Sequence, residues 1–150
     1  MRESAKSTIV FASDHGGVNL RKILQKEAES AGFFVEDCGT HSLDSVDYPE
    51  QVSIAVENFI KLKAKYLILI CGSGIGVSIA ANRHPKLRAV AATNTTEARL
   101  SREHNHANCL CLGERLTGID LAKEIFYCFV NTDPDLSDRH CRRVAKLESI

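Results

Sequence analysis

Residues 66–81 read YLILICGSGIGVSIAA, and this stretch decides the fold. Its first five residues, 66–70, are apolar without alternation, which is typical of a strand that is covered on both faces. The glycine-rich sequence CGSGIG follows at 71–76, and a helical pattern continues to about Asn82. A buried strand, a tight glycine turn and a helix in direct succession indicate one unit of a parallel α/β sheet.

The same alternation continues on both sides of this unit. Apolar, β-rich runs predict four further strands, at 8–13, 33–38, 88–92 and 108–112. Periodic apolar positions predict further helices: one that ends at Gly32, one that begins near Pro49, and others over 95–104, 118–130 and the region from about Ser137. Strand and helix thus alternate five times. This order favours a single domain over 1–150, with a three-layer α/β/α, Rossmann-like fold, a five-stranded parallel sheet and a C-terminal helix.

Two of these helices carry apolar residues on one face, and we expect the first of these stripes to be buried. The stripes are Val52, Ala55, Val56, Phe59 and Ile60 in one helix, and Leu121, Ala122, Ile125, Phe126 and Phe129 in the other. In a parallel sheet of this kind, ligands bind at the carboxyl ends of the strands. The candidate segments there are Asp14-His15, the loop after Cys38, Cys71 to Gly76, and the residues after Ala92 and Leu112.

The composition excludes several classes of partner. The chain has 150 residues with 19 basic and 19 acidic side chains, so nothing in its charge favours nucleic acid or an anionic membrane. The longest apolar run, 67–71, is too short to span a bilayer, and residues 1–8, MRESAKST, carry no export signal. We therefore expect a cytoplasmic protein whose six cysteines are free and mostly buried.

The loop 71–76 has the composition of an anion site, because glycines let backbone N–H groups point at a ligand and the next helix begins there. It lacks the lysine of a nucleotide-hydrolase phosphate loop, and its last glycine falls one residue early for the dinucleotide fingerprint. Backbone donors near Cys71 favour a thiolate, which could take a proton from a carbon next to a carbonyl. A turn without ligand, beside a buried thiol, is the alternative interpretation.

The start of the last predicted helix is basic, with Arg139, His140, Arg142 and Arg143. Cations at the N-terminus of a helix are unfavourable because the helix dipole is positive there. An anion bound between them would offset this repulsion. Arg139 and Arg143 lie one turn apart, so their two guanidinium groups could hold a phosphate. A solvated basic face is the alternative.

A second group is His104-Asn105-His106. His104 could transfer protons near neutral pH, or could bond the last carbonyls of its helix. A metal site that joined these histidines with Cys109 or Cys111 would match no zinc spacing. We therefore predict no metal.

In order along the chain, these residues resemble the family of type B ribose-5-phosphate isomerases and galactose-6-phosphate isomerase subunits. The resemblance runs from Ile9 to about Leu147. It is carried by Asp14-His15-Gly16, Asp47-Tyr48-Pro49, CGSGIGVSIAANR at 71–83, Arg88-Ala89-Val90, SREHNHAN at 101–108, Leu112-Gly113-Glu114-Arg115 and Arg139-His140-x-x-Arg143. It implies a homodimer, or a dimer of dimers, with active sites shared between subunits, and no metal or organic cofactor.

The implied reaction interconverts ribose 5-phosphate and ribulose 5-phosphate through a cis-enediolate, a step of the non-oxidative pentose phosphate pathway. Cys71 matches the base, Ser73 the side chain that holds the enediolate, and His104 the residue that opens the sugar ring. Where some members carry a Glu in the loop this chain has Val77, which leaves Cys71 as the base. The implied substrate-binding residues, which include the phosphate grip of His15 and three arginines, are Asp14, His15, Tyr48, Gly72, Gly74, Gly76, Asn105, Arg115, Arg139 and Arg143.

Two other functions stay open at this stage. The first is an isomerase of a six-carbon sugar phosphate, such as galactose or allose 6-phosphate, because one more carbon changes the pocket length more than the chemistry. The second is a non-catalytic domain that binds a sugar phosphate or a nucleotide, which would need neither Cys71 nor His104.

Overall fold

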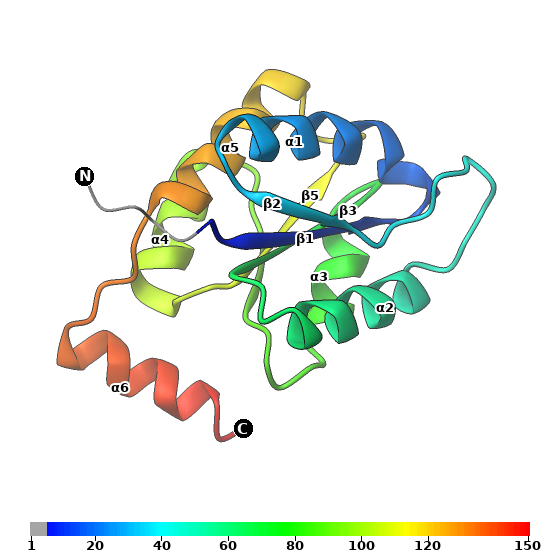
Figure 1. Ribbon diagram of the computed structural model, residues 1–150. Coiled ribbons are helices and arrows are strands. Elements are labelled where there is room, and N and C mark those ends of the chain that lie inside the picture. Colours follow the sequence, from blue (N-terminus) through cyan, green and yellow to red (C-terminus); the bar gives the residue numbers. More distant parts are fainter. Residues whose placement is uncertain (1–5) are drawn as a thin grey trace.

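The computed structural model describes residues 6–150. Five parallel strands form one sheet in the order β2-β1-β3-β5-β4, which confirms the predicted α/β fold (Figure 1). The strands are β1 (Thr8–Ser13), β2 (Phe34–Asp37), β3 (Tyr66–Cys71), β4 (Ala89–Ala91) and β5 (Cys109–Gly113). Of the polar N-terminal stretch that we predicted to carry no export signal, residues 1–5 lie outside the described residues.

Helices cover both faces of the sheet. They are α1 (Val18–Ser30), α2 (Tyr48–Lys61), α3 (Ile75–Ala81), α4 (Thr95–Asn105), α5 (Ile119–Asn131) and α6 (Asp138–Leu147), with a short 3-10 turn at His15–Gly17. Each boundary agrees with the sequence prediction to within a few residues. Among residues 6–150, no helix is long and apolar enough to cross a membrane.

The sheet separates two apolar cores. On one face, strand residues such as Phe11 and Ile68 pack with α1, α4 and α5. On the other face, Val10 and Leu69 pack with α2 and α3. Every residue of β3 is buried, because this central strand has helices on both sides. The decisive stretch at 66–71 therefore lies in the middle of the molecule.

The two predicted stripes are buried except at one position in each. Ile60 of α2 is 50 % exposed, so its predicted burial was wrong, and Leu121 of α5 is 40 % exposed. At 3.6 residues per turn, each of the two side chains points about 90° away from the centre of its stripe. That direction runs along the surface of the sheet rather than into it.

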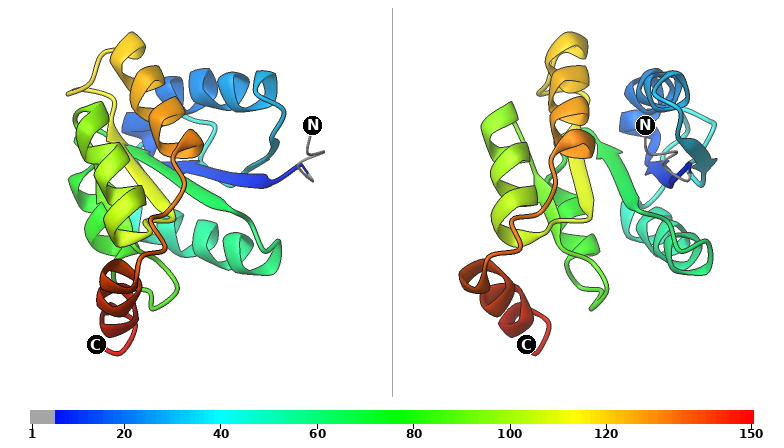
Figure 2. Two further views of the ribbon diagram at one scale, coloured as in Figure 1. Left: turned by 90° about the vertical axis from the view of Figure 1, so that its left-hand side faces the viewer. Right: turned by 60° about the vertical axis from the view of Figure 1, so that its left-hand side comes forward.

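The C-terminal helix α6 stands apart from the three layers. It packs against α4, and the views from other sides show the same separation from the sheet (Figure 2). The carboxyl ends of the strands lie on the opposite side of the molecule from α6 (Figure 1). The sheet therefore has two ends on opposite sides of the molecule. We call the end formed by the carboxyl ends of the strands the carboxyl edge, and the end formed by their amino ends the amino edge.

Candidate active site

Cys71 is the last residue of β3 and is 5 % exposed. The N–H of Gly74 donates to its Sγ across 3.1 Å. This contact depends on the turn after the strand, in which Gly74 has a left-handed φ of 76° that glycine adopts without strain. A backbone donor aimed at a sulfur favours a negative charge on it. The turn therefore holds a backbone donor against the sulfur at the end of the strand.

The loop from β5 lies directly against this turn. Glu114 N–H donates to the carbonyl of Cys71, and Arg115 N–H donates to that of Gly72, each at 3.0 Å. The guanidinium of Arg115 covers Gly72 so closely that a Cβ at this position would collide with it. Ser73 is half-buried, and its Oγ accepts the N–H of Ile75 at 3.2 Å. Arg115 and the Ser73 hydroxyl therefore lie at the turn that follows Cys71.

The end of β1 contributes Asp14 and His15 to the same edge. Asp14 Oδ1 accepts the N–H of Gly16 at 2.8 Å, and a Cβ on Gly16 would lie 3.2 Å from the backbone nitrogen of Gly72. His15 Nδ1 accepts the N–H of Val46 at 3.2 Å, so its ring proton sits on Nε2. An Nε2–H group is a donor that suits a phosphate oxygen.

Tyr48 completes this edge from the start of α2. Its ring lies against Gly76, where a Cβ would come within 2.8 Å of the ring carbon Cζ. The structure thus brings together nine predicted residues, which we call the carboxyl-edge cluster: Asp14, His15, Tyr48, Cys71, Gly72, Ser73, Gly74, Gly76 and Arg115.

The remaining four predicted residues, His104, Asn105, Arg139 and Arg143, line one cavity of about 230 Å³ between α4 and α6. We call them the amino-edge cluster. The ring of His104 stacks on that of His140, with centroids 4.4 Å apart and planes 8° apart. Burial, together with the charges of His104 and the two arginines, lowers the pKa of His140, while Asp135 opposes that shift. At neutral pH, therefore, the ring that stacks on His104 is an uncharged His140.

The two clusters lie at opposite ends of the sheet. Helix α4 begins after β4 at the carboxyl edge and runs back, so His104 is at its far end. At 3.3 Å per residue, the six residues of β3 place the two edges about 20 Å apart. One sugar phosphate cannot reach from Cys71 to Arg143 over that distance. Within one chain, therefore, the predicted site residues form two separate halves.

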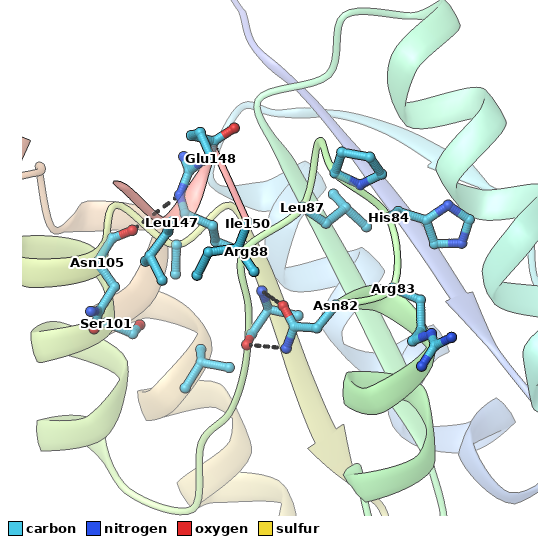
Figure 3. Close-up of a pocket in the computed structure, with 14 residues that line it drawn as sticks. Asn82, Arg83, His84, Leu87, Arg88, Ser101, Asn105, Leu147, Glu148 and Ile150 are labelled. Atoms are coloured by element: carbon cyan, nitrogen blue, oxygen red, sulfur yellow. Dashed lines mark hydrogen bonds and ion pairs between the residues drawn. The ribbon is translucent and has the colours of Figure 1, made fainter. Parts of the chain in front are cut away.

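A groove of about 460 Å³ adjoins the amino-edge cluster and shares Asn105 and Leu147 with its cavity (Figure 3). Arg88 forms one side through an ion pair with Glu148. Asn82, just after α3, donates to the carbonyl of Ala89 and accepts its N–H, at 2.9 and 2.8 Å. The groove therefore connects the end of α3 to the amino-edge cluster.

The other thiols differ from Cys71 in their surroundings. All six cysteines are free, and Cys109 and Cys111 are buried in β5, within the predicted strand at 108–112, with their sulfurs 3.9 Å apart. Burial raises the pKa of Cys111. Burial and two nearby carboxylates raise the pKa of Cys38 to about 11. Within residues 6–150, no group of three or more His, Cys, Asp or Glu side chains is placed to hold a metal ion.

Sequence reasoning missed several residues that support these clusters. Arg21 is fully buried in α1, although its spacing with Leu24 and Ala28 already places it on the buried stripe. Glu114 Oε1 accepts the N–H of Leu20 and so joins the β5 loop to the start of α1. His140, noted only as one of several basic residues, forms the wall behind His104. Arg21 gave a signal of its own in the sequence, because a charged residue on an apolar stripe is unusual.

Comparison with known proteins decides the family. Residues 9–147 match the family of Ribose/Galactose Isomerase. The chain belongs to this family. It is 37 % identical to ribose-5-phosphate isomerase B of Escherichia coli (strain K12), over 95 % of each chain. It is also 38 % identical to D-erythrulose-4-phosphate isomerase 2 of Mycolicibacterium smegmatis (strain ATCC 700084 / mc(2)155), over 78 % of this chain and 79 % of that one.

A solved structure agrees. Ribose-5-phosphate isomerase B of Clostridium thermocellum is 42 % identical and superimposes with a TM-score of 0.91, covering 95 % of each chain. The resemblance read from the sequence is therefore confirmed, and the chain is a sugar-phosphate isomerase. The family membership favours an enzyme over the alternative of a non-catalytic binding domain.

Proposed function

We propose that this isomerase interconverts ribose 5-phosphate and ribulose 5-phosphate. The observation that carries the proposal is the thiol of Cys71 at the end of β3, with a backbone donor on its sulfur and with Arg115 and His15 at the same edge. The carboxyl edge thus places a base next to groups that can bind a phosphate or stabilise a developing oxyanion. The relative in Escherichia coli and the structure from Clostridium thermocellum both carry the name of this activity.

The chemistry follows from the carboxyl-edge cluster. The Cys71 thiolate takes the proton from C2 of the open-chain aldose, and the electrons move to give a cis-enediolate. The hydroxyl of Ser73 and nearby amides of the glycine loop hold the negative charge. Cys71 then returns the proton to C1, while the proton of the C2 hydroxyl passes to the oxygen on C1. The ketose leaves, and the thiolate is ready again.

His104 is assigned the opening of the furanose ring. An imidazole near neutral pH can donate a proton to the ring oxygen and remove one from the hydroxyl on C1. Its stacking on the neutral ring of His140 limits its rotation and keeps its orientation. Arg139 and Arg143 flank it in the same cavity and are suited to the phosphate group.

Because these residues lie at the amino edge, we propose that each complete site forms between two copies of the chain. Two neighbours in the outer face of α3 support this arrangement: Ile75 is 56 % exposed, Ile79 is 61 % exposed, and they lie one turn apart. Exposed apolar side chains that adjoin each other are typical of an interface between subunits.

A twofold axis that passes through α3 would bring the carboxyl edge of each subunit next to the amino edge of the other. If that axis is perpendicular to α3, the α3 helices of the two subunits pack antiparallel to each other. The start of α3, beside Cys71, then meets the end of the partner's α3, which adjoins the groove and the amino-edge cluster. This arrangement brings one subunit's base to the other subunit's arginines.

The function is tested by measuring catalytic efficiency on ribose, allose and galactose phosphates side by side. We expect ribose 5-phosphate to be preferred over either six-carbon substrate by about 10–200-fold, the range for one extra carbon in a fitted pocket. A higher efficiency on allose or galactose 6-phosphate would transfer the proposal to the six-carbon alternative. The cytoplasmic location and the pathway stay predictions.

The role of His104 is tested by His104→Asn, which removes the titratable ring but keeps a polar side chain. We expect kcat/KM on ribose 5-phosphate, which is mostly cyclic, to fall by about 10²-fold. Erythrose 4-phosphate cannot form a furanose ring, because the hydroxyl that would close it carries the phosphate. On that substrate the same change should cost less than about threefold. Equal losses on both substrates would refute the ring-opening role.

A further inference from the structure

Arg21 has no role in the chemistry proposed above, yet it is the largest fully buried side chain among residues 6–150. Its guanidinium contacts three separate segments. Nη1 donates to Ser13 Oγ at the end of β1, Nε lies 3.2 Å from Asp37 Oδ1 at the end of β2, and Nη2 lies 3.5 Å from His41 Nδ1. A buried cation is costly unless it is paired, so these contacts hold all three segments to it.

The segment that gains most from these contacts is 38–47, between β2 and α2. Much of it is exposed, and its internal hydrogen bonds are short-range turns, such as those from Ser42 N–H to Thr40 Oγ1 and from Asp44 N–H to Ser42 Oγ. Such a segment orders itself poorly, because few buried contacts offset the entropy that ordering removes. Its order therefore depends on its anchors.

The first half of this segment is shaped around Arg21. Gly39 N–H donates to Asp37 Oδ1 at 3.1 Å, the same oxygen that faces Arg21 Nε. The backbone of Gly39 passes so close to the guanidinium that a Cβ there would collide with Nη1. His41 also lies 3.8 Å from Asp37 Oδ2. Arg21 thus fixes the path of the chain as it leaves β2.

The second half of the segment reaches the carboxyl-edge cluster. Val46 N–H donates to His15 Nδ1 and so sets the tautomer of that ring. Two residues later, Tyr48 begins α2 and lays its ring over Gly76 in the catalytic loop. Ser13, which accepts from Arg21, directly precedes Asp14. The contacts of Arg21 therefore lead to three proposed substrate-binding residues, none of which it touches.

We propose that Arg21 is a positioning residue, which holds segment 38–47 in the conformation that places His15 and Tyr48 against the substrate. This inference rests on the proposed function, because substrate binding is what the positioning serves. Arg21 acts before any substrate arrives, so its loss should weaken binding more than it slows the chemical step.

The test compares Arg21→Met with Lys22→Met, which removes the same charge from the exposed neighbouring position of α1. Two readouts are used: amide hydrogen exchange of peptides that cover 38–47, and the steady-state kinetics with ribose 5-phosphate. For Arg21→Met we expect exchange in 38–47 to speed up by about tenfold. We expect KM to rise by about tenfold, with kcat within about threefold of the parent. Lys22→Met should match the parent in both readouts.

Two more variants separate positioning from a general loss of stability. Arg21→Lys keeps a cation beside Asp37 but loses the fork of donors, so its KM should lie between those of the parent and Arg21→Met. Gly39→Ala keeps the arginine and displaces the segment by collision, so it should raise KM without removing charge. These two variants keep the proposal testable if Arg21→Met does not fold.

Three outcomes would overturn the proposal: unchanged exchange in 38–47, faster exchange with an unchanged KM, or a lower melting temperature with parental kinetics. A parent protein that turned over no sugar phosphate would refute the proposed function instead. The exchange measurement would then decide alone whether Arg21 orders the segment.

Discussion

Replacing Cys71 by alanine is expected to lower kcat on ribose 5-phosphate by about 10²–10⁴-fold, the usual contribution of a positioned base. The thiol is the group at the carboxyl edge that can take a proton from C2, and its sulfur already receives the Gly74 N–H. Binding should survive, because the phosphate and the sugar hydroxyls are held by other side chains. We therefore expect KM to change by less than about threefold.

Two companion variants exclude a folding defect as the cause of this loss. Cys71→Ser keeps the volume of a buried side chain, but its hydroxyl is too weak an acid to serve as the base, so it should lose as much activity as the alanine variant. Cys128→Ala removes a half-buried thiol from α5 on the other face of the sheet, where Sγ donates to Thr95 O, and should keep parental kcat. Parental activity in either Cys71 variant, measured with purified protein, would end the assignment of the base.

The fold could be predicted well from the sequence because its signals are local. An apolar run without alternation, as at 66–70, is expected in a central strand whose two faces are both covered by helices. Gly32, Pro49 and Asp133-Pro134 mark breaks whose chemistry acts within a few residues. The order of the strands is different, since β5 lies between β3 and β4. That order depends on how distant segments pack, and no local pattern records it.

The candidate site also combines features that local sequence predicts with features that depend on how distant segments pack. The position of the glycine loop and Cys71 at the carboxyl edge could be predicted, since residues after parallel strands gather at one edge, whereas Arg115 was implied by the family resemblance. The separation of His104 from Cys71 becomes visible only once α4 is traced to the other edge. The contacts of Arg21 with Ser13, Asp37 and His41 join segments that adjoin in space but not in sequence. Periodicity places Arg21 on the buried face of α1 but does not name its partners.

Mixing two inactive variants is expected to restore activity, if complete sites form between subunits. One variant is Cys71→Ala, which keeps its amino-edge cluster. The other carries Arg139→Met and Arg143→Met, which removes the proposed phosphate grip but keeps Cys71. A dimer with one chain of each kind holds one intact site, built from the second chain's thiol and the first chain's arginines, and one site that lacks both.

Unfolding the two variants together and refolding them should therefore give about a quarter of the parental activity, because about half of randomly formed dimers are mixed and each holds one good site of two. Each variant alone should stay near background, so the gain is large and cannot arise from leftover activity. Native mass spectrometry would confirm that mixed dimers are present. If they form and activity stays at background, each chain must complete its own site, and the about 20 Å between the two edges of the sheet would have to close within one subunit. A sheet packed on both faces leaves no hinge for such a movement, which is why we expect complementation.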